Sequence, residues 1–288
     1  MDPERYFEGI ALQLAQAIQQ NRLDEVERLA GQAELNQFYR ENMTLLIWAI
    51  LADRQEALDL LLRAGANPNL TSDDGIQPVA LAAGAKEDNP NLKVLLRHGG
   101  DPNSKSRGEP ALHIAFDSEY YTNVELLLNA KADINIRDEH DDTILIKAGY
   151  QEKFARAAAL IQRGADINAS SEGGGIALEV QQATPKIGSK TYQEQAQLRQ
   201  LLISRGVHFP IFHPSYKPYT ALLARWHQTP EGQQWNKQLT ELGLDPTGFG
   251  AKWVELDRKA WAAFKAWMKT NRIAEPGQTK PQFIDPNG

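Results

Sequence analysis

The chain has 288 residues, of which 42% are hydrophobic and 24% are charged, so it can bury a large core. No run approaches the roughly 18 consecutive apolar residues of a membrane-spanning helix, and Met1-Asp2-Pro3-Glu4-Arg5 does not resemble a signal peptide. The absence of cysteine excludes disulfides and thiolate-bound metals. We expect a soluble protein that is cytoplasmic if Met1 is the native start, with the bacterial periplasm as the alternative.

The charge is unevenly distributed along the chain. The net charge is −6, yet residues 210–288 hold ten Lys and Arg against seven Asp and Glu, so residues 1–209 carry −9. An acidic surface without a basic stripe argues against nucleic acid as the partner. A protein with a basic surface fits this charge better.

Two columns of residues recur with one period between residues 36 and 178. A leucine-class residue returns every 33 positions, and an asparagine returns every 32 to 34. A period of this length predicts a stack of similar units, each burying its apolar face against its neighbours. The two columns are Leu46, Val79, Leu112, Leu145 and Leu178, and Asn36, Asn69, Asn103, Asn135 and Asn168.

Each unit has the pattern of a helix, a turn, a second helix and a loop. In the unit at 43–69, the apolar run 43–52 has helical composition, and 56–63 is apolar at helical spacing after a polar break. Gly65 is expected to stop the second helix, because glycine adopts the left-handed conformation without a steric cost. Pro68 then prevents the helix from resuming.

The loop after the second helix carries the residues by which the chain resembles a known family. Residues 61–69, Leu-Leu-Arg-Ala-Gly-Ala-Asn-Pro-Asn, have close copies at 95–103, 127–135 and 160–168, and a degraded copy at 201–209. These segments resemble the Leu-Leu-x-x-Gly-Ala-Asp-x-Asn signature of ankyrin repeats. The family's other signature, Thr-Pro-Leu-His-x-Ala, is eroded and keeps its histidine only at His113.

The resemblance covers about residues 10–209 and implies an all-α ankyrin-repeat solenoid that binds proteins. It also implies that His113 forms hydrogen bonds between neighbouring loops. We expect a divergent N-terminal capping repeat at 1–36 and five ankyrin repeats at 37–209, with a protruding loop at 184–191.

Residues 210–288 are expected to form a Trp-rich helical extension that caps the solenoid and ends in a loose tail. They hold five of the six tryptophans. We expect helices near 218–228, 230–243 and 248–271. The last of these has one apolar stripe, formed by Trp253, Leu256, Ala260, Phe264, Trp267 and Met268.

The sequence predicts no catalytic, cofactor or metal site. Residues 188–191, Gly-Ser-Lys-Thr, lack the Gly-Lys-Thr adjacency and the preceding strand of a phosphate loop. Residues 138–142 lack the alternation and central glycine of a calcium loop, so we interpret them as a solvated charged hairpin tip. We therefore expect a protein that is not an enzyme. The alternative is an enzyme or small-ligand-binding module in the Trp-rich extension, with the repeats as a docking arm.

The resemblance implies that the hairpin tips and first helices line one concave face that meets the partner. The tips differ from one another while the helices behind them do not, which favours recognition of one dedicated partner. We expect a monomer that binds this partner and, in the sharpest version, inhibits it, for example as an immunity protein against a secreted toxin or lipase. The candidate partner-binding residues are Asp73, Asp74, Arg107, Glu109, Glu119, Tyr120, Tyr121, Arg137, His140, Asp141 and Tyr150.

Removing residues 210–288 should destabilise the repeats. The last unit of a solenoid leaves an apolar face open, and the stripe around Phe264 is the nearest apolar surface in sequence that can cover it. Because losing the packing of a buried Trp or Phe costs about 3–5 kcal/mol, the 1–209 fragment should aggregate or melt earlier than the full chain. Thermal melting and size-exclusion chromatography check this expectation. A monomeric fragment that melts with the full chain would mark the extension as an independent module.

Overall fold

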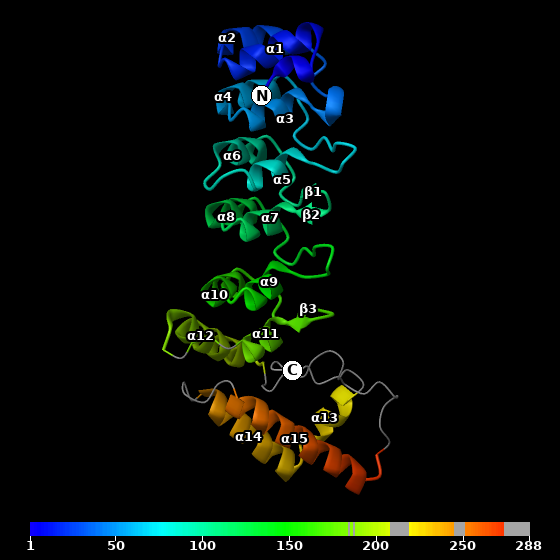
Figure 1. Cartoon of the computed structure of the whole chain (residues 1–288), viewed down its shortest axis with the longest axis vertical. Helices are drawn as coiled ribbons and strands as arrows, with labels where there is room; N and C mark the ends of the chain where they lie inside the picture. The colour runs from blue at the N-terminus through cyan, green and yellow to red at the C-terminus, as the bar shows by residue number, and fades with distance from the viewer. Residues whose placement is uncertain (184, 187, 208–218, 245–250, 274–288) are drawn as a thin grey trace. The chain divides into compact units, whose positions relative to one another are not determined.

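The computed structural model describes residues 1–183, 185–186, 188–207, 219–244 and 251–273. Its helices and short strands follow one another along the chain as drawn in Figure 1. The chain divides into two compact units, residues 1–144 and residues 145–288. No helix in the described part combines the length and the apolarity needed to cross a lipid bilayer.

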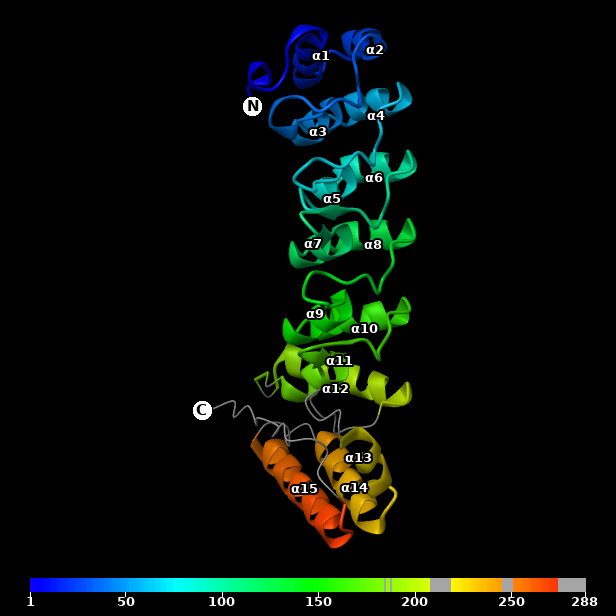
Figure 2. The same cartoon turned by 90° about the vertical axis from the view of Figure 1, so that its right-hand side faces the viewer.

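The first unit is a stack of helix pairs. The first helix of each pair packs on the first helix of the next, and the second helices form a row of their own (Figure 2). This arrangement confirms the all-α repeat fold predicted from the sequence period. The elements are η1 (Pro3–Arg5), α1 (Gly9–Gln19), α2 (Leu23–Ala30), η2 (Arg40–Asn42), α3 (Leu45–Leu51), α4 (Gln55–Arg63), α5 (Pro78–Ala83), α6 (Pro90–Arg97), β1 (Lys105–Ser106), β2 (Glu109–Pro110), α7 (Ala111–Asp117) and α8 (Tyr121–Asn129).

Local sequence determines where these helices begin and end. The Thr44 hydroxyl accepts a hydrogen bond from the N–H of Ile47 at 3.0 Å and caps α3, while Pro78 occupies the first turn of α5. Gly65 follows α4 with a φ of 103°, as expected for a helix-stopping glycine. Lys131 takes the equivalent place after α8 with a φ of 73°, a conformation that costs a residue with a Cβ atom about 1–2 kcal/mol.

The leucine-class column forms the core of the first unit. Leu46, Val79 and Leu112 are at most 2% exposed. Trp48 in α3 packs back on the preceding helix pair. Its ring is fully buried, and its Nε1–H donates to the carbonyl of Ala15 in the preceding helix pair at 2.9 Å.

The asparagine column links successive loops. Asn69 donates through Nδ2 to the carbonyl of Gly99 at 3.0 Å and accepts from the N–H of Asp101 at 2.7 Å. Asn36 makes the same two bonds to the loop after α4, at 3.1 and 2.7 Å. One side-chain amide therefore satisfies a carbonyl and an N–H in the loop that ends the next second helix.

The second unit continues with helix pairs and ends in three further helices. Its elements are α9 (Ile144–Tyr150), α10 (Phe154–Gln162), β3 (Ser170–Ser171), β4 (Gly174–Gly175), α11 (Ile176–Gln182), α12 (Lys190–Ser204), α13 (Thr220–Trp226), α14 (Pro230–Leu244) and α15 (Ala251–Thr270). The loop expected at 184–191 is too long by two residues. Helix α12 already begins at Lys190, because the Ser189 hydroxyl caps it by accepting from the N–H of Tyr192 at 3.1 Å.

Helices α13 and α15 form an aromatic cluster. Tyr219, Trp226, Trp261 and Phe264 are each at most 8% exposed, and their ring centroids lie 5.1 to 6.3 Å apart where they contact. The three helices predicted near 218–271 are therefore present. The side chain of Trp253 and the tail beyond residue 273 lie outside the described residues. Docking of this cluster on the final repeat stays a prediction.

Replacing Asn69 should loosen the stack of loops. Asn69→Ala removes two inter-repeat hydrogen bonds, each worth about 1 kcal/mol, so the free energy of unfolding should fall by about 2 kcal/mol. Asn69→Asp keeps the acceptor and loses the donor, and should also destabilise the chain. Gln32→Ala removes only the local bond from Gln32 to the Arg28 carbonyl and serves as the control. Denaturant unfolding that gives equal losses for Asn69→Ala and Gln32→Ala would contradict the role of the column.

Candidate functional site

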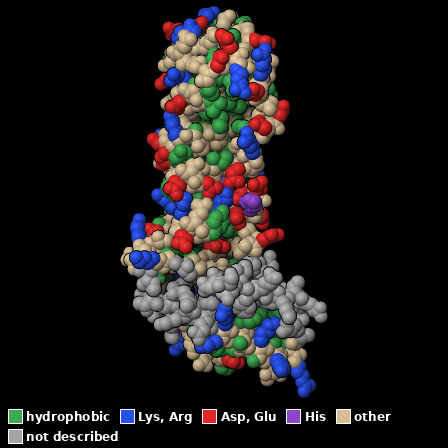
Figure 3. Space-filling view, viewed as in Figure 1, with side chains coloured by type: hydrophobic (Ala, Val, Ile, Leu, Met, Phe, Trp, Pro, Cys, Tyr) green, Lys and Arg blue, Asp and Glu red, His purple; other side chains and the backbone are tan. Residues whose placement is uncertain are grey.

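The hairpin face of the first unit carries apolar and charged side chains together. We define it as the loops 39–44, 71–77, 104–110 and 137–142 with the first helices α3, α5 and α7. In the view of Figure 3, apolar side chains gather over the first repeats, with acidic and basic side chains on either side. A surface of this composition suits protein recognition.

Exposed apolar residues of the first helices supply the apolar part. Leu51 at the end of α3 is 44% exposed, and Leu81 in α5 and Ile114 in α7 are half-buried. A Cβ atom on Gly84 would lie 2.5 Å from Cγ2 of Ile114, so the glycine lets neighbouring first helices approach closely. The exposed parts of these side chains could be buried by a partner.

The structure brings two of the predicted tip residues together. Asp74 and Arg107, from successive hairpins, lie 3.8 Å apart as a solvent-exposed ion pair. The same hairpins are joined through their backbones, because the N–H of Arg107 donates to the Gly75 carbonyl at 3.0 Å. Asp73 beside them is exposed, and within the described residues its carboxylate has no ion-pair partner. Among the described residues, the Asp73 carboxylate therefore adds an uncompensated negative charge at this tip.

The predicted residues at the turn between α7 and α8 differ in their exposure. Glu119 is exposed with a φ of 61°, and Tyr120 is half-buried as the residue before α8. The Tyr121 ring packs edge-on against Phe116 with centroids 5.9 Å apart. The Tyr121 ring therefore packs within the repeat, and only its exposed part could contact a partner.

The remaining predicted residues lie on two hairpins and in the second unit. Arg137 and Asp141 form an ion pair at 3.0 Å within one tip, and Asp141 has a φ of 63°. The His140 side chain is 75% exposed at the same tip. Tyr150, at the end of α9 in the second unit, is 48% exposed.

Glu109, by contrast, points into a buried cluster. Its Oε1 lies 3.7 Å from Nδ1 of His113, and Oδ2 of Asp138 lies 3.7 Å from the same nitrogen. The interpretation of 138–142 as a solvated tip is correct for residues 139–141 and wrong for Asp138, whose side chain is fully buried. Asp138 turns inward because its Oδ1 accepts from the N–H groups of His140 and Asp142, at 2.9 and 3.0 Å.

His113 itself behaves as the resemblance implies. Its Nε2 lies 2.9 Å from the carbonyl of Ile136, in the loop of the following repeat. The sequence analysis did not predict that two carboxylates 29 residues apart, those of Glu109 and Asp138, face the other ring nitrogen of His113. The signal in the sequence is that, with the motif aligned on His113, Pro110 occupies the threonine position and Glu109 directly precedes it.

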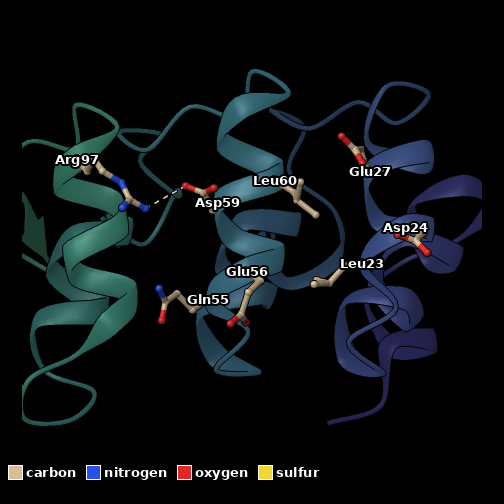
Figure 4. A pocket seen from close by; sticks show the side chains of 8 residues that line it. All are labelled: Leu23, Asp24, Glu27, Gln55, Glu56, Asp59, Leu60 and Arg97. Atoms are coloured by element: carbon tan, nitrogen blue, oxygen red, sulfur yellow. Dashed lines mark hydrogen bonds and ion pairs between the residues drawn. The ribbon is translucent and has the colours of Figure 1, made fainter.

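A groove on the second helices is a further concave feature that was not predicted. It has a volume of about 290 Å³ between α2 and α4, with Arg97 of α6 at one end (Figure 4). Its signal in the sequence is the repetition of acidic residues about one period apart, as in Glu27 and Asp59. The lining residues are Leu23, Asp24, Glu27, Gln55, Glu56, Asp59, Leu60 and Arg97.

Asp59 is the best-anchored carboxylate of this groove. Burial raises its pKa, but the hydrogen bond from His98 at 2.7 Å and the charges of Arg63 and Arg97 together lower the pKa further, so the net shift is downward. Its side chain is only 15% exposed. The carboxylate thus links α4 to α6 and stabilises the stack.

Comparison with known protein families identifies the repeats. Residues 56–138 and 79–171 match a family model of ankyrin repeats in three copies. The chain is 39% identical over 82 residues to alpha-latrocrustotoxin-Lt1a of Latrodectus tredecimguttatus, which is 28% of this chain and 6% of the toxin. It is 29% identical over 185 residues to ankyrin repeat and SOCS box protein 6 of Homo sapiens, which is 60% of this chain and 43% of that protein. The chain thus spans less than half the length of these curated relatives.

The fold has counterparts among solved structures. The chain is similar to the ankyrin repeat domain of Bcl-3, a member of the IkappaB protein family, with a TM-score of 0.56 and 26% identity. That match covers 67% of this chain and 86% of the Bcl-3 domain.

Neutralising Asp59 should weaken the chain in a pH-dependent way. A carboxyl with a lowered pKa stabilises the fold above its ordinary pKa, and this contribution disappears as the pH falls through the folded-state pKa. Asp59→Asn should therefore lower the free energy of unfolding by about 1 kcal/mol at neutral pH. This difference from the original chain should vanish well below pH 4. Denaturant unfolding at several pH values measures it. Asp24→Asn, in the same groove but outside the described ion pairs, should show no such trend. A pH-independent effect of Asp59→Asn would contradict this account.

Proposed function

Since this chain belongs to the ankyrin-repeat family, whose repeats form protein–protein interaction modules, we propose that its hairpin face binds one dedicated protein partner and inhibits it. The observation that carries the proposal is the combination on this face of exposed apolar Leu51 with charged tips such as Asp73. Anchoring apolar contacts with a charged rim is the usual composition of a specific interface.

The charge of the first unit supports a basic partner. Residues 1–144 hold 13 Lys and Arg against 25 Asp and Glu, a net charge of −12. A surface of one sign attracts a partner of the other sign and accelerates association, and salt weakens this effect. A basic patch on the partner would therefore interact with the tip carboxylates at long range first. The exposed apolar side chains of the first helices would be buried only in the final complex.

Inhibition is the finer part of the proposal. A rigid stack of loops that covers a partner's functional surface blocks that surface without chemistry of its own. An immunity protein that occludes a secreted toxin or lipase is the sharpest form, and it rests on the fold alone. The rival location, a ligand site among the C-terminal aromatics, has less support, because Tyr219, Trp226, Trp261 and Phe264 are buried against one another.

Charge reversal at Asp73 should slow partner binding without affecting stability. Asp73→Lys places a positive charge on an exposed tip, so the association rate should fall and lose part of its salt dependence, while the free energy of unfolding changes by less than about 0.5 kcal/mol. The original chain would serve as bait in its native host, and the captured protein would then be used in kinetic binding measurements and in assays of its own activity.

The matched control is Glu27→Lys, which makes the same charge change on the second-helix row. It should change the association rate less than Asp73→Lys does. We prefer Asp73 to Asp141 because Asp141 combines a positive φ with an ion pair to Arg137, so its replacement would also disturb the tip. Equal slowing by both variants would move the interface off the hairpin face, and a partner that stays fully active when bound would end the inhibition proposal.

A further inference from the structure

A buried group of three side chains lies where two successive hairpins of the first unit meet. Glu109 comes from β2, His113 from the first turns of α7, and Asp138 from the next hairpin. One potential ligand atom from each residue lies within 4.8 Å of the other two. His113 and Asp138 are fully buried, and the Glu109 side chain is 28% exposed. The group therefore has a closed inner side and one side open to solvent.

The hydrogen bonds around the group orient His113. A carbonyl oxygen can only accept, so the 2.9 Å contact with the Ile136 carbonyl requires the proton to be on Nε2. In the neutral ring, Nδ1 then presents its lone pair to the two carboxylates, each 3.7 Å away. A histidine that binds a metal through one nitrogen typically donates its other N–H to a backbone carbonyl or a carboxylate in this way.

Asp138 is oriented by a similar arrangement. Its Oδ1 accepts from two backbone N–H groups of its own hairpin, and its Oδ2 turns towards His113. Ligating carboxylates in metal sites are commonly held by such hydrogen bonds. The two inner ligands are thus held in place by backbone groups, which reduces the ordering required when a cation binds.

We propose that Glu109, His113 and Asp138 bind a divalent transition-metal ion, with Zn²⁺ as the best match, and that the ion clasps two neighbouring hairpins together. One imidazole nitrogen and two carboxylate oxygens are ligands that Zn²⁺ accepts, whereas Mg²⁺ and Ca²⁺ take oxygen ligands. Zn²⁺ with ligand distances near 2.0 Å places tetrahedral ligands about 3.3 Å apart. The two distances of 3.7 Å to His113 would shorten by a few tenths of an ångström. The Glu109 and Asp138 oxygens, which lie within 4.8 Å of each other, would also move to about 3.3 Å, and the partly exposed Glu109 side chain can make that movement, with solvent supplying the fourth ligand beside it.

Metal binding at this group, which lies within two hairpins of the hairpin face, requires no partner to be present. The alternative occupant of the same geometry is a proton: a charged imidazolium held between the carboxylates also satisfies all three groups. The two states differ in a measurable way, because only the metal site gains stability from added Zn²⁺. An ion that binds the native chain alone raises its melting temperature in proportion to the logarithm of the ion concentration.

The test uses the full chain, stripped of metal with a chelator and titrated with Zn²⁺ by calorimetry and in thermal melts. We expect one equivalent to bind, and a concentration of 100 times Kd to raise the melting temperature by about 5 °C. Visible absorption of Co²⁺ typical of a tetrahedral N and O ligand set provides a second readout. Glu109→Gln removes the one ligand that solvent reaches and should weaken binding at least about tenfold.

The control variant is His140→Gln, which removes the exposed histidine of the neighbouring tip. It should leave the Zn²⁺ affinity and the melting shift unchanged. Circular dichroism of Glu109→Gln would establish that the variant is folded. The proposal fails if Zn²⁺ leaves the melting temperature of the original chain unchanged, if Glu109→Gln binds as tightly as the original chain, or if His140→Gln abolishes binding. The first outcome would assign the cluster to a buried imidazolium.

Discussion

Each repeat of the first unit must satisfy polar backbone groups in the loop where its second helix ends, and an asparagine of the preceding repeat does so. The side chain of Asn69 forms hydrogen bonds with the carbonyl of Gly99 and the N–H of Asp101. Asn36 bonds the loop that follows α4 in the same way. Because each amide spans from one unit to the next, the asparagine column couples successive loops in this part of the stack.

This constraint leaves other positions free to vary. The residues where successive first helices end, one period apart, are Leu51 at the end of α3, Gly84 directly after α5 and Asp117 at the end of α7. They differ completely in chemistry, although the leucine-class column beside them stays buried. A repeat that is held together by its loops and core can therefore present a different surface in each unit, which is the physical basis for a specific binding face.

The acidic groups of the first unit fall into two physical classes. Asp59 and Asp138 contact side chains of neighbouring repeats, Glu109 contacts His113 of its own repeat, and all three act within the fold. Asp73 and the other exposed tip carboxylates contribute little to stability, because charge pairs in water are weak. Their negative charges instead create an electrostatic field in the solvent, which would attract a basic partner before contact.

The sequence by itself determined the period, the helix pairs, the stop at Gly65 and the three helices of the Trp-rich extension. These features depend on local chemistry, namely helical spacing of apolar residues, capping by hydroxyls and proline, and the left-handed conformation of glycine. The resemblance to ankyrin repeats rested on the same local signals. For the candidate binding face, the sequence indicated the right loops but could not tell exposed Asp73 from paired Asp74 or from Tyr121, which packs on Phe116.

Only the tertiary structure decided which side chains turn inward at the loops. Trp48 packs back on α1 because its indole N–H reaches the Ala15 carbonyl, a contact 33 residues away in sequence. Asp138 is buried with Glu109 around His113 because backbone N–H groups of its own hairpin rotate the carboxylate inward. A repeat period specifies which positions are equivalent, but the direction of a side chain in a turn depends on the backbone groups and neighbours that it meets there, and those exist only once the repeats have stacked.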